Sequence, residues 1–109
     1  MADFMKILQQ AQEMQGRLAK IQEELEAVTV TGSAGGGLVT VEANGKGEVR
    51  RVRIDRTVVN PDDTEMLEDL VLVAVTDAQK KAGEAQQSKT QDEMGKLAGG
   101  LPLPFKLPF

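Results

Sequence analysis

The stretch LVTVEANGKGEVRRVRID, residues 38–55, decides the fold of this chain. Two runs of alternating apolar and polar residues flank the tetrapeptide NGKG, and an Asn-Gly pair between such runs is a strong signal for a β-hairpin. Val49 is out of phase with Val52, which predicts a bulge or a register change near Arg50. A third alternating run, residues 28–32, precedes the hairpin across the loop SAGGG. We therefore predict a three-stranded antiparallel meander with one covered face.

A long amphipathic helix is predicted before this meander, from Asp3 to Val28. Its apolar residues follow a heptad seam, with alternating steps of four and three and no proline. The seam consists of Ile7, Ala11, Met14, Leu18, Ile21, Leu25 and Val28. Such a helix is roughly 35–39 Å long, whereas a compact domain of this size is only about 34 Å across. We expect the helix to span or project from the body, with its seam on a second helix of its own chain or of a partner.

A second long helix is predicted after the meander. Asn60 is the expected N-cap, Pro61 occupies the first turn, and the acids that follow suit the positive end of the helix dipole. Apolar residues at helical spacing continue to about Ala85, although Gly83 weakens the end. Residues 86–97 are polar and are predicted to form a frayed or separate helix.

Length and composition favour one small α+β domain that gains buried area from a second copy. The chain has 109 residues, of which 40% are hydrophobic but only 3% aromatic, and small aliphatic side chains bury less area each. We assign the domain to residues 1–98 and a flexible Pro-rich tail to residues 99–109. We also expect a homodimer, with either the sheet or the helical seam providing the contact.

The missing residue types argue against an enzyme. Without Cys the chain has no thiolate nucleophile, and without His it lacks the commonest general base and metal ligand. The acidic run at residues 62–69 lacks the spacing of a calcium loop, and the glycine loop at residues 32–37 leads into a strand without the lysine of a phosphate-binding loop. A metal-dependent hydrolase using residues 62–69 is the minor alternative. We expect no cofactor, no small-molecule substrate, no membrane span and no secretory signal, and hence a cytoplasmic protein.

Charge is segregated along the chain, although the formal net charge is −4. Residues 43–56 carry five basic and two acidic side chains, whereas residues 62–69 carry five acidic side chains and no basic one. Arg51 and Arg53 share one strand face, which favours either a solvated outer face or a patch that contacts phosphates. No aromatic residues interleave with the basic ones and no helix-turn-helix pattern is present, so any DNA contact is expected to involve the backbone more than the bases.

The stretches GGGLVTVEANGKGEVRRVRID and DDTEMLEDLVLVAVTDAQKKAGE resemble the YbaB/EbfC family of bacterial nucleoid-associated proteins. The opening MKILQQAQEMQGRLAKIQEELEAVTVTGSAG and the closing LPLPFKLPF resemble this family as well. The resemblance implies a homodimer whose helices project like the arms of tweezers, bind duplex DNA and act in nucleoid organisation and gene regulation. The chain departs from the family pattern at Thr40, Arg56 and Val75-Thr76.

Two hypotheses follow. In the first, a homodimer binds double-stranded DNA with little sequence specificity through basic residues, for which the resemblance favours the helices over the sheet. In the second, the chain is a protein-interaction module associated with DNA metabolism, and its contact with DNA is incidental. The candidate DNA-contacting residues are Lys6, Arg17, Lys20, Lys80 and Lys81 on the helices and Lys46, Arg51 and Arg53 on the hairpin.

Overall fold

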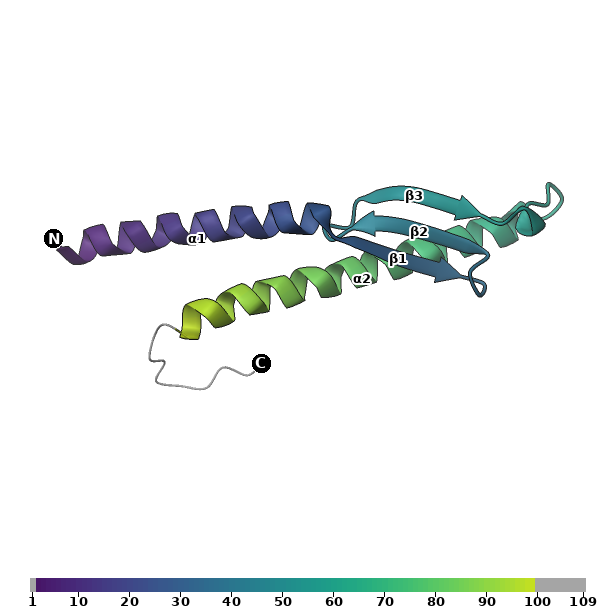
Figure 1. Cartoon of the computed structure of the whole chain (residues 1–109). Helices are drawn as coiled ribbons and strands as arrows, with labels where there is room; N and C mark the ends of the chain where they lie inside the picture. The colour runs from purple at the N-terminus through teal and green to yellow at the C-terminus, as the bar shows by residue number, and fades with distance from the viewer. Residues whose placement is uncertain (1, 100–109) are drawn as a thin grey trace.

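The computed structural model describes residues 2–99 as two long helices joined by a three-stranded sheet (Figure 1). The elements are helix α1 (Ala2–Ala27), strands β1 (Thr29–Ala34), β2 (Val39–Asn44) and β3 (Val49–Ile54), the short 3-10 helix η1 (Arg56–Val58) and helix α2 (Thr64–Gly99). The predicted α+β class and order of elements are confirmed. The molecule measures 72 × 25 × 17 Å, so α1 projects from the sheet as predicted. Residues 100–109, the body of the predicted tail, lie outside the described residues.

The sheet is the predicted antiparallel meander, in the order β1-β2-β3. Arg51 pairs with Glu42 but Val49 pairs with Ala43, which leaves Arg50 as the extra residue of a bulge. The predicted bulge is therefore confirmed. It also returns Val49 to the sheet face that carries Val52, since their partners Ala43 and Val41 both point to the buried side.

The loop between β1 and β2 is shorter than predicted. Strand β1 continues through Ser33 to Ala34, both of which the prediction places in the loop. The reversal is made by Gly35, Gly36 and Gly37, whose φ angles of 62°, 69° and 100° lie in the left-handed region that favours glycine. The three glycines thus make a tight turn, which allows the strand to extend.

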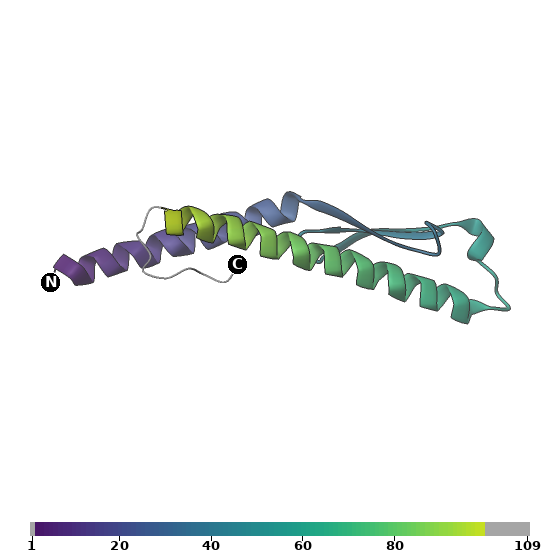
Figure 2. The same ribbon diagram turned by 90° about the horizontal axis from the view of Figure 1, so that it is seen from below.

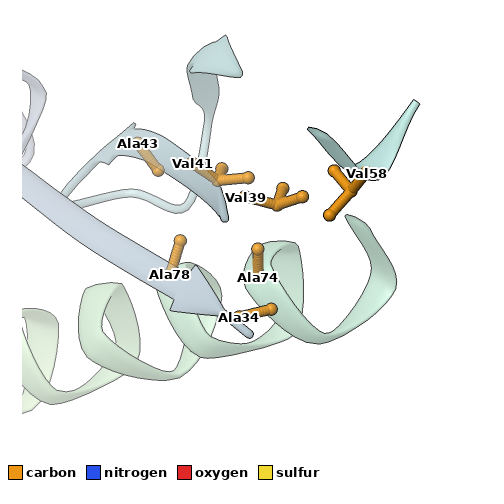
Figure 3. Packing of buried hydrophobic residues seen from close by; sticks show 7 residues of the cluster. All are labelled: Ala34, Val39, Val41, Ala43, Val58, Ala74 and Ala78. Atoms are coloured by element: carbon orange, nitrogen blue, oxygen red, sulfur yellow. The ribbon is translucent and has the colours of Figure 1, made fainter. Parts of the chain in front are cut away.

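Helix α2 covers one face of β1 and β2 and forms the core with them (Figure 2). Val39 and Val41 point from the sheet towards Ala74 and Ala78 of the helix, and all four side chains have no exposed surface. The core cluster consists of Ala34, Val39, Val41, Ala43, Val58, Ala74 and Ala78 (Figure 3). Because the helix contributes alanines, its backbone lies close to the strands.

Strand β3 departs from the prediction of one covered face. Val49, Val52 and Ile54 lie on the same sheet face as the core but remain 43%, 43% and 41% exposed. The reason is that α2 packs chiefly against β1 and β2. We refer to these three residues as the β3 ledge.

Helix α2 begins three residues later than predicted, at Thr64. Asn60 accepts a hydrogen bond on its side chain from the backbone N–H of Asp62 and on its carbonyl from the N–H of Asp63, both at 3.0 Å. These bonds close a turn, and the N-cap is Asp63, whose carboxylate accepts the N–H of Met66 at 3.3 Å. The prediction of Asn60 as the N-cap was wrong, because the Asn-Pro-Asp-Asp sequence forms its own turn first.

The predicted weak end of α2 is also wrong, because the helix is continuous through Gly83 to Gly99. Contacts with α1 and the hairpin accompany this extension. Lys89 Nζ lies 3.0 Å from Glu24 Oε2, and Gln86 Nε2 donates to the carbonyl of Gly45 at 2.9 Å. Such bonds fix side chains that a polar sequence alone suggests are free.

The heptad seam of α1 is buried only near the sheet. Ile21 and Leu25 are 4% and 1% exposed, beside the hairpin and α2. Towards the N-terminus Leu18 is 50% and Ile7 is 59% exposed. The expectation that the whole seam packs on another helix therefore holds within one chain only for its last part. No helix within residues 2–99 has an apolar stretch long enough to cross a membrane.

Candidate nucleic-acid interface

The sheet has an open polar face on the side opposite α2. Because Val39 and Val41 point towards the helix, the residues between and beside them point the other way. Across the strands, Thr31, Glu42 and Arg51 form one row of this face, and Ser33, Thr40 and Arg53 form the next. Neither Figure 1 nor Figure 2 shows a described helix crossing this face. The structure therefore places Arg51 and Arg53 side by side on an open surface, as their alternation in sequence predicted.

Arg51 and Arg53 are exposed and available to a ligand. Within residues 2–99 neither side chain forms an ion pair. Their neighbour Arg50, at the bulge, lies 3.9 Å from Glu48. A guanidinium that lacks a carboxylate partner keeps its five donors for phosphate oxygens.

Strand β3 is set in place by the hairpin turn, which depends on Asn44. Asn44 is 2% exposed, and its Oδ1 accepts the backbone N–H groups of Lys46 and Glu48, each at 3.0 Å. Its Nδ2 donates to Glu48 Oε1 at 2.7 Å. This bond, with the charges of Lys46 and Arg50, lowers the pKa of Glu48. The turn is thus fixed by a buried amide that both donates and accepts hydrogen bonds.

Lys46 does not join the arginine pair, although all three were predicted as one basic hairpin. Its Nζ lies 3.6 Å from Glu26 Oε1, so the side chain is directed to the end of α1. Lys46 therefore ties the hairpin to the helix.

Two of the predicted helical cations are engaged within the chain. Arg17 lies 3.9 Å from Glu93 on α2. Lys81 lies 3.3 Å from Asp77 and donates to the backbone carbonyl of Thr31 at 2.9 Å. These two side chains hold α2 to α1 and to the edge of β1.

The remaining helical candidates are exposed and form no ion pair among the described residues: Lys6 and Lys20 on α1 and Lys80 on α2. Lys6 and Lys20 are fourteen positions apart, or about 21 Å along the helix. The structure thus brings Arg51 and Arg53 together and leaves these three lysines dispersed.

The electrostatic balance differs between the helices and the hairpin. Helix α1 carries three basic and five acidic residues, and α2 carries four basic and seven acidic residues. Residues 46–56 carry five basic and two acidic residues. The hairpin is therefore the part of the described chain where positive charge is in excess, and the field there favours polyanions.

Sequence reasoning missed the β3 ledge, because alternation of apolar and polar residues cannot distinguish a strand that a helix covers from one that lies beside the helix.

The acidic run at residues 62–69 was predicted to lie at the start of a helix. Asp63 does cap α2, and no cluster of metal-ligating side chains is present among residues 2–99. The acidic run is thus a turn followed by a first helical turn.

Comparisons with known proteins agree over the length of the chain. Residues 1–101 match the model of the YbaB/EbfC DNA-binding family. A nucleoid-associated protein of Gemmatimonas aurantiaca is 51% identical over 107 residues, covering 98% of this chain and 99% of that protein. Nucleoid-associated protein Atu0095 of Agrobacterium fabrum is 48% identical over 111 residues, and the alignment covers 100% of this chain and 100% of that protein. Among solved structures, protein HP0035 of Helicobacter pylori is 23% identical, with a TM-score of 0.72 over 81% of this chain and 92% of that chain.

Proposed function

Because this chain belongs to the YbaB/EbfC DNA-binding family, we propose that it binds double-stranded DNA as a homodimer with little sequence specificity. Its role is non-catalytic and lies in nucleoid organisation and gene regulation, within the cytoplasm. The names of its nucleoid-associated relatives support this role.

The observation that carries the proposal is the pair of free guanidinium groups on the open sheet face. Arg51 and Arg53 are two residues apart on one strand, so they are about 7 Å apart along it. They belong to the positively charged hairpin and form no ion pair within residues 2–99. We place the main phosphate contact here, with Lys6, Lys20 and Lys80 as secondary contacts.

Low sequence specificity follows from the kind of groups on this face. The rows beside the arginines consist of Thr, Ser and one Glu, without aromatic side chains that stack on bases. Helix α2 lies on the other face, so no described helix is presented beside the arginine pair for insertion into a major groove. Contacts to phosphates position a protein on DNA but carry little information about sequence.

The homodimer is supported by the β3 ledge. Three aliphatic side chains more than two fifths exposed lie together on an edge strand, beside the core of the same sheet face. An exposed apolar patch next to unpaired strand edges is typical of an association surface. A second copy seated here would continue the core across a two-fold axis and bring together four arginines in place of two.

The same ledge also favours the second hypothesis, a surface for another protein. The homodimer and the protein-interaction module are distinguished by which molecule occupies the β3 ledge. A dimer in the purified protein that Val52→Asp dissociates assigns the ledge to a second copy. A stoichiometric partner that survives nuclease treatment and dissociates on Val52→Asp assigns it to that partner.

The test of DNA binding is a salt titration with several duplexes of unrelated sequence, followed by fluorescence anisotropy. If all four arginines of a dimer contact phosphates, they should contribute roughly −3.6 to the slope of log K against log[salt], at about 0.9 per contact, and each lysine that also contacts a phosphate should make the slope steeper. Duplexes of equal length should bind with similar affinity. Absence of a complex with any duplex at low salt would overturn the proposal.

A further inference from the structure

The part of α1 that ends at Leu18 carries apolar side chains that nothing in the described part of the chain covers. Phe4 is 64%, Ile7 is 59% and Leu18 is 50% exposed. These three, together with Ala11 and Met14, recur at helical spacing, and we call them the arm stripe. The arm stripe continues the line of Ile21 and Leu25, which are buried at the sheet. A helix face of this kind in water indicates a missing occupant.

Helix α2 ends beside the arm stripe. The ion pair between Arg17 and Glu93 sets the two antiparallel helices level with each other. Gly99 is six residues beyond Glu93, or about 9 Å further along α2, which brings the end of α2 level with about Ala11. In Figure 1 helix α1 extends past this end. The chain that follows Gly99 therefore starts at the middle of the arm stripe.

The sequence of that following segment is apolar and rich in proline. In residues 101–109, LPLPFKLPF, every odd position carries Leu or Phe, and the positions between them carry three prolines and one lysine. Two of the three phenylalanines in the protein are here, and the third is Phe4 on the arm stripe. We propose that residues 101–109 dock on the arm stripe of their own chain.

The length and stiffness of this tail suit the arm stripe. Ten residues after Gly99 reach about 31 Å in the polyproline II conformation, whereas each end of the arm stripe, Phe4 or Leu18, is about 10 Å from the level of Ala11. The tail can therefore reach either end of the arm stripe. Prolines restrict the free tail, so less conformational entropy is lost when it docks. Extended proline-rich segments are commonly bound on apolar, aromatic-bearing surfaces.

The β3 ledge is a poorer site for the same tail. Its central residue Val52 pairs with Val41, whose other neighbour Gly32 lies against Ala78 of α2. Ala78 is twenty-one residues before Gly99, or about 32 Å back along the helix. The tail would need its full length to reach Val52, whereas the arm stripe begins beside it.

The three isoleucines of the chain provide the test, since each reports on a different surface. Ile7 lies on the arm stripe, Ile21 at the buried root of α1, and Ile54 on the β3 ledge. In a spectrum of the protein labelled at isoleucine δ1-methyl groups, deletion of residues 101–109 should move the Ile7 signal by more than its linewidth. The Ile21 and Ile54 signals should stay in place, which also shows that the truncated protein is folded.

A peptide in trans completes the experiment. The synthetic peptide LPLPFKLPF, added to the truncated protein, should return the Ile7 signal towards its original position. The control peptide SPSPSKSPS, which keeps the prolines and lysine but lacks the large apolar groups, should not. An Ile7 signal that ignores the deletion overturns the proposal. So does an Ile7 signal that depends on the concentration of the full-length protein, because a second copy would then occupy the stripe.

Discussion

The backbone of Gly32 in β1 lies directly against the backbone of Ala78 in α2. A Cβ atom at Gly32 would collide with the backbone nitrogen of Ala78 and with the carbonyl oxygen of Ala74. Neither atom can move without moving the helix. This contact sets α2 beneath β1 and β2, and so it also determines that β3 is left uncovered.

We therefore expect Gly32→Ala to lower the free energy of unfolding by about 3 kcal/mol, near the upper end of the usual cost of overpacking. Gly83→Ala is the control, since a Cβ at Gly83 meets nothing within 4 Å. It should raise stability by roughly 0.5–1 kcal/mol, through helix propensity. Both are measured by urea unfolding followed by circular dichroism at one protein concentration. Equal effects of the two substitutions would contradict the backbone contact.

Asp77 makes the stability of the α2–β1 contact depend on pH. Its carboxylate accepts the N–H of Ser33 at 3.0 Å and lies 3.3 Å from Lys81 Nζ, and these bonds, the first above all, lower the pKa of Asp77 from 3.8. A lowered folded-state pKa gives stability that is fully present above the unfolded value and is lost as the pH falls through the folded value.

Asp77→Asn should accordingly lower Tm by a few degrees at neutral pH, and the difference from the wild type should shrink as the pH is brought below about 3.8. Thermal unfolding at a series of pH values checks this. Asp92→Asn, an exposed change on the same helix, is the control and should lower Tm less. A gap between wild type and Asp77→Asn that stays constant down to the acid limit would rule out this account.

Val52→Asp should convert the proposed homodimer into a monomer, because a carboxylate on the β3 ledge would be buried in the interface without a partner. Val73→Asp is the matched control. Val73 is 55% exposed and lies one turn from Asp77, on the side of α2 that faces β1. Light scattering after size exclusion should give 11.8 kDa for Val52→Asp and twice that mass for Val73→Asp. A wild type that is already monomeric at micromolar concentration would refute the dimer.

Arg51→Ala combined with Arg53→Ala should weaken DNA binding at least tenfold. The slope of log K against log[salt] should become less steep by about 0.9 for each phosphate that the variant no longer contacts. Arg50→Ala is the control on the same strand, because Arg50 is already beside Glu48. Lys6→Ala combined with Lys20→Ala should have a smaller effect. If the lysine pair alone abolishes binding, the DNA site lies on the helices.

Local sequence patterns predicted those elements of secondary structure that depend on residues close to one another in the chain. The hairpin turn at residues 44–47 and the bulge at Arg50 follow from alternation and from an Asn-Gly pair. The start of α2 was misplaced because Asn60 and Asp63 are both good caps, and only the backbone path shows which of them is used.

Features that depend on distant contacts could not be predicted in this way. The polar end of α2 is a continuous helix, in which Lys89 pairs with Glu24 of α1 and Glu93 pairs with Arg17 of α1. No local signal in the sequence marks these ion pairs. The exposure of Val52 depends on which strands lie above α2, which Gly32 and the alanines of the helix determine together. Likewise, the spacing of the arginines located the candidate site, but the sequence could not show which cations are already paired.

The two outer strands of the sheet differ in a way that limits how many copies can join. On β1, the carbonyl of Thr31 and the N–H of Ser33 are occupied by Lys81 and Asp77 of the chain's own helix. An edge strand invites addition of another strand through such backbone groups, so α2 blocks growth on that side. Of the two outer strands, β3 is then the one left open to a neighbour within residues 2–99. For the homodimer proposed above, this predicts subunits with a single strand edge to offer, so that assembly through the sheet closes at a pair instead of lengthening into a filament.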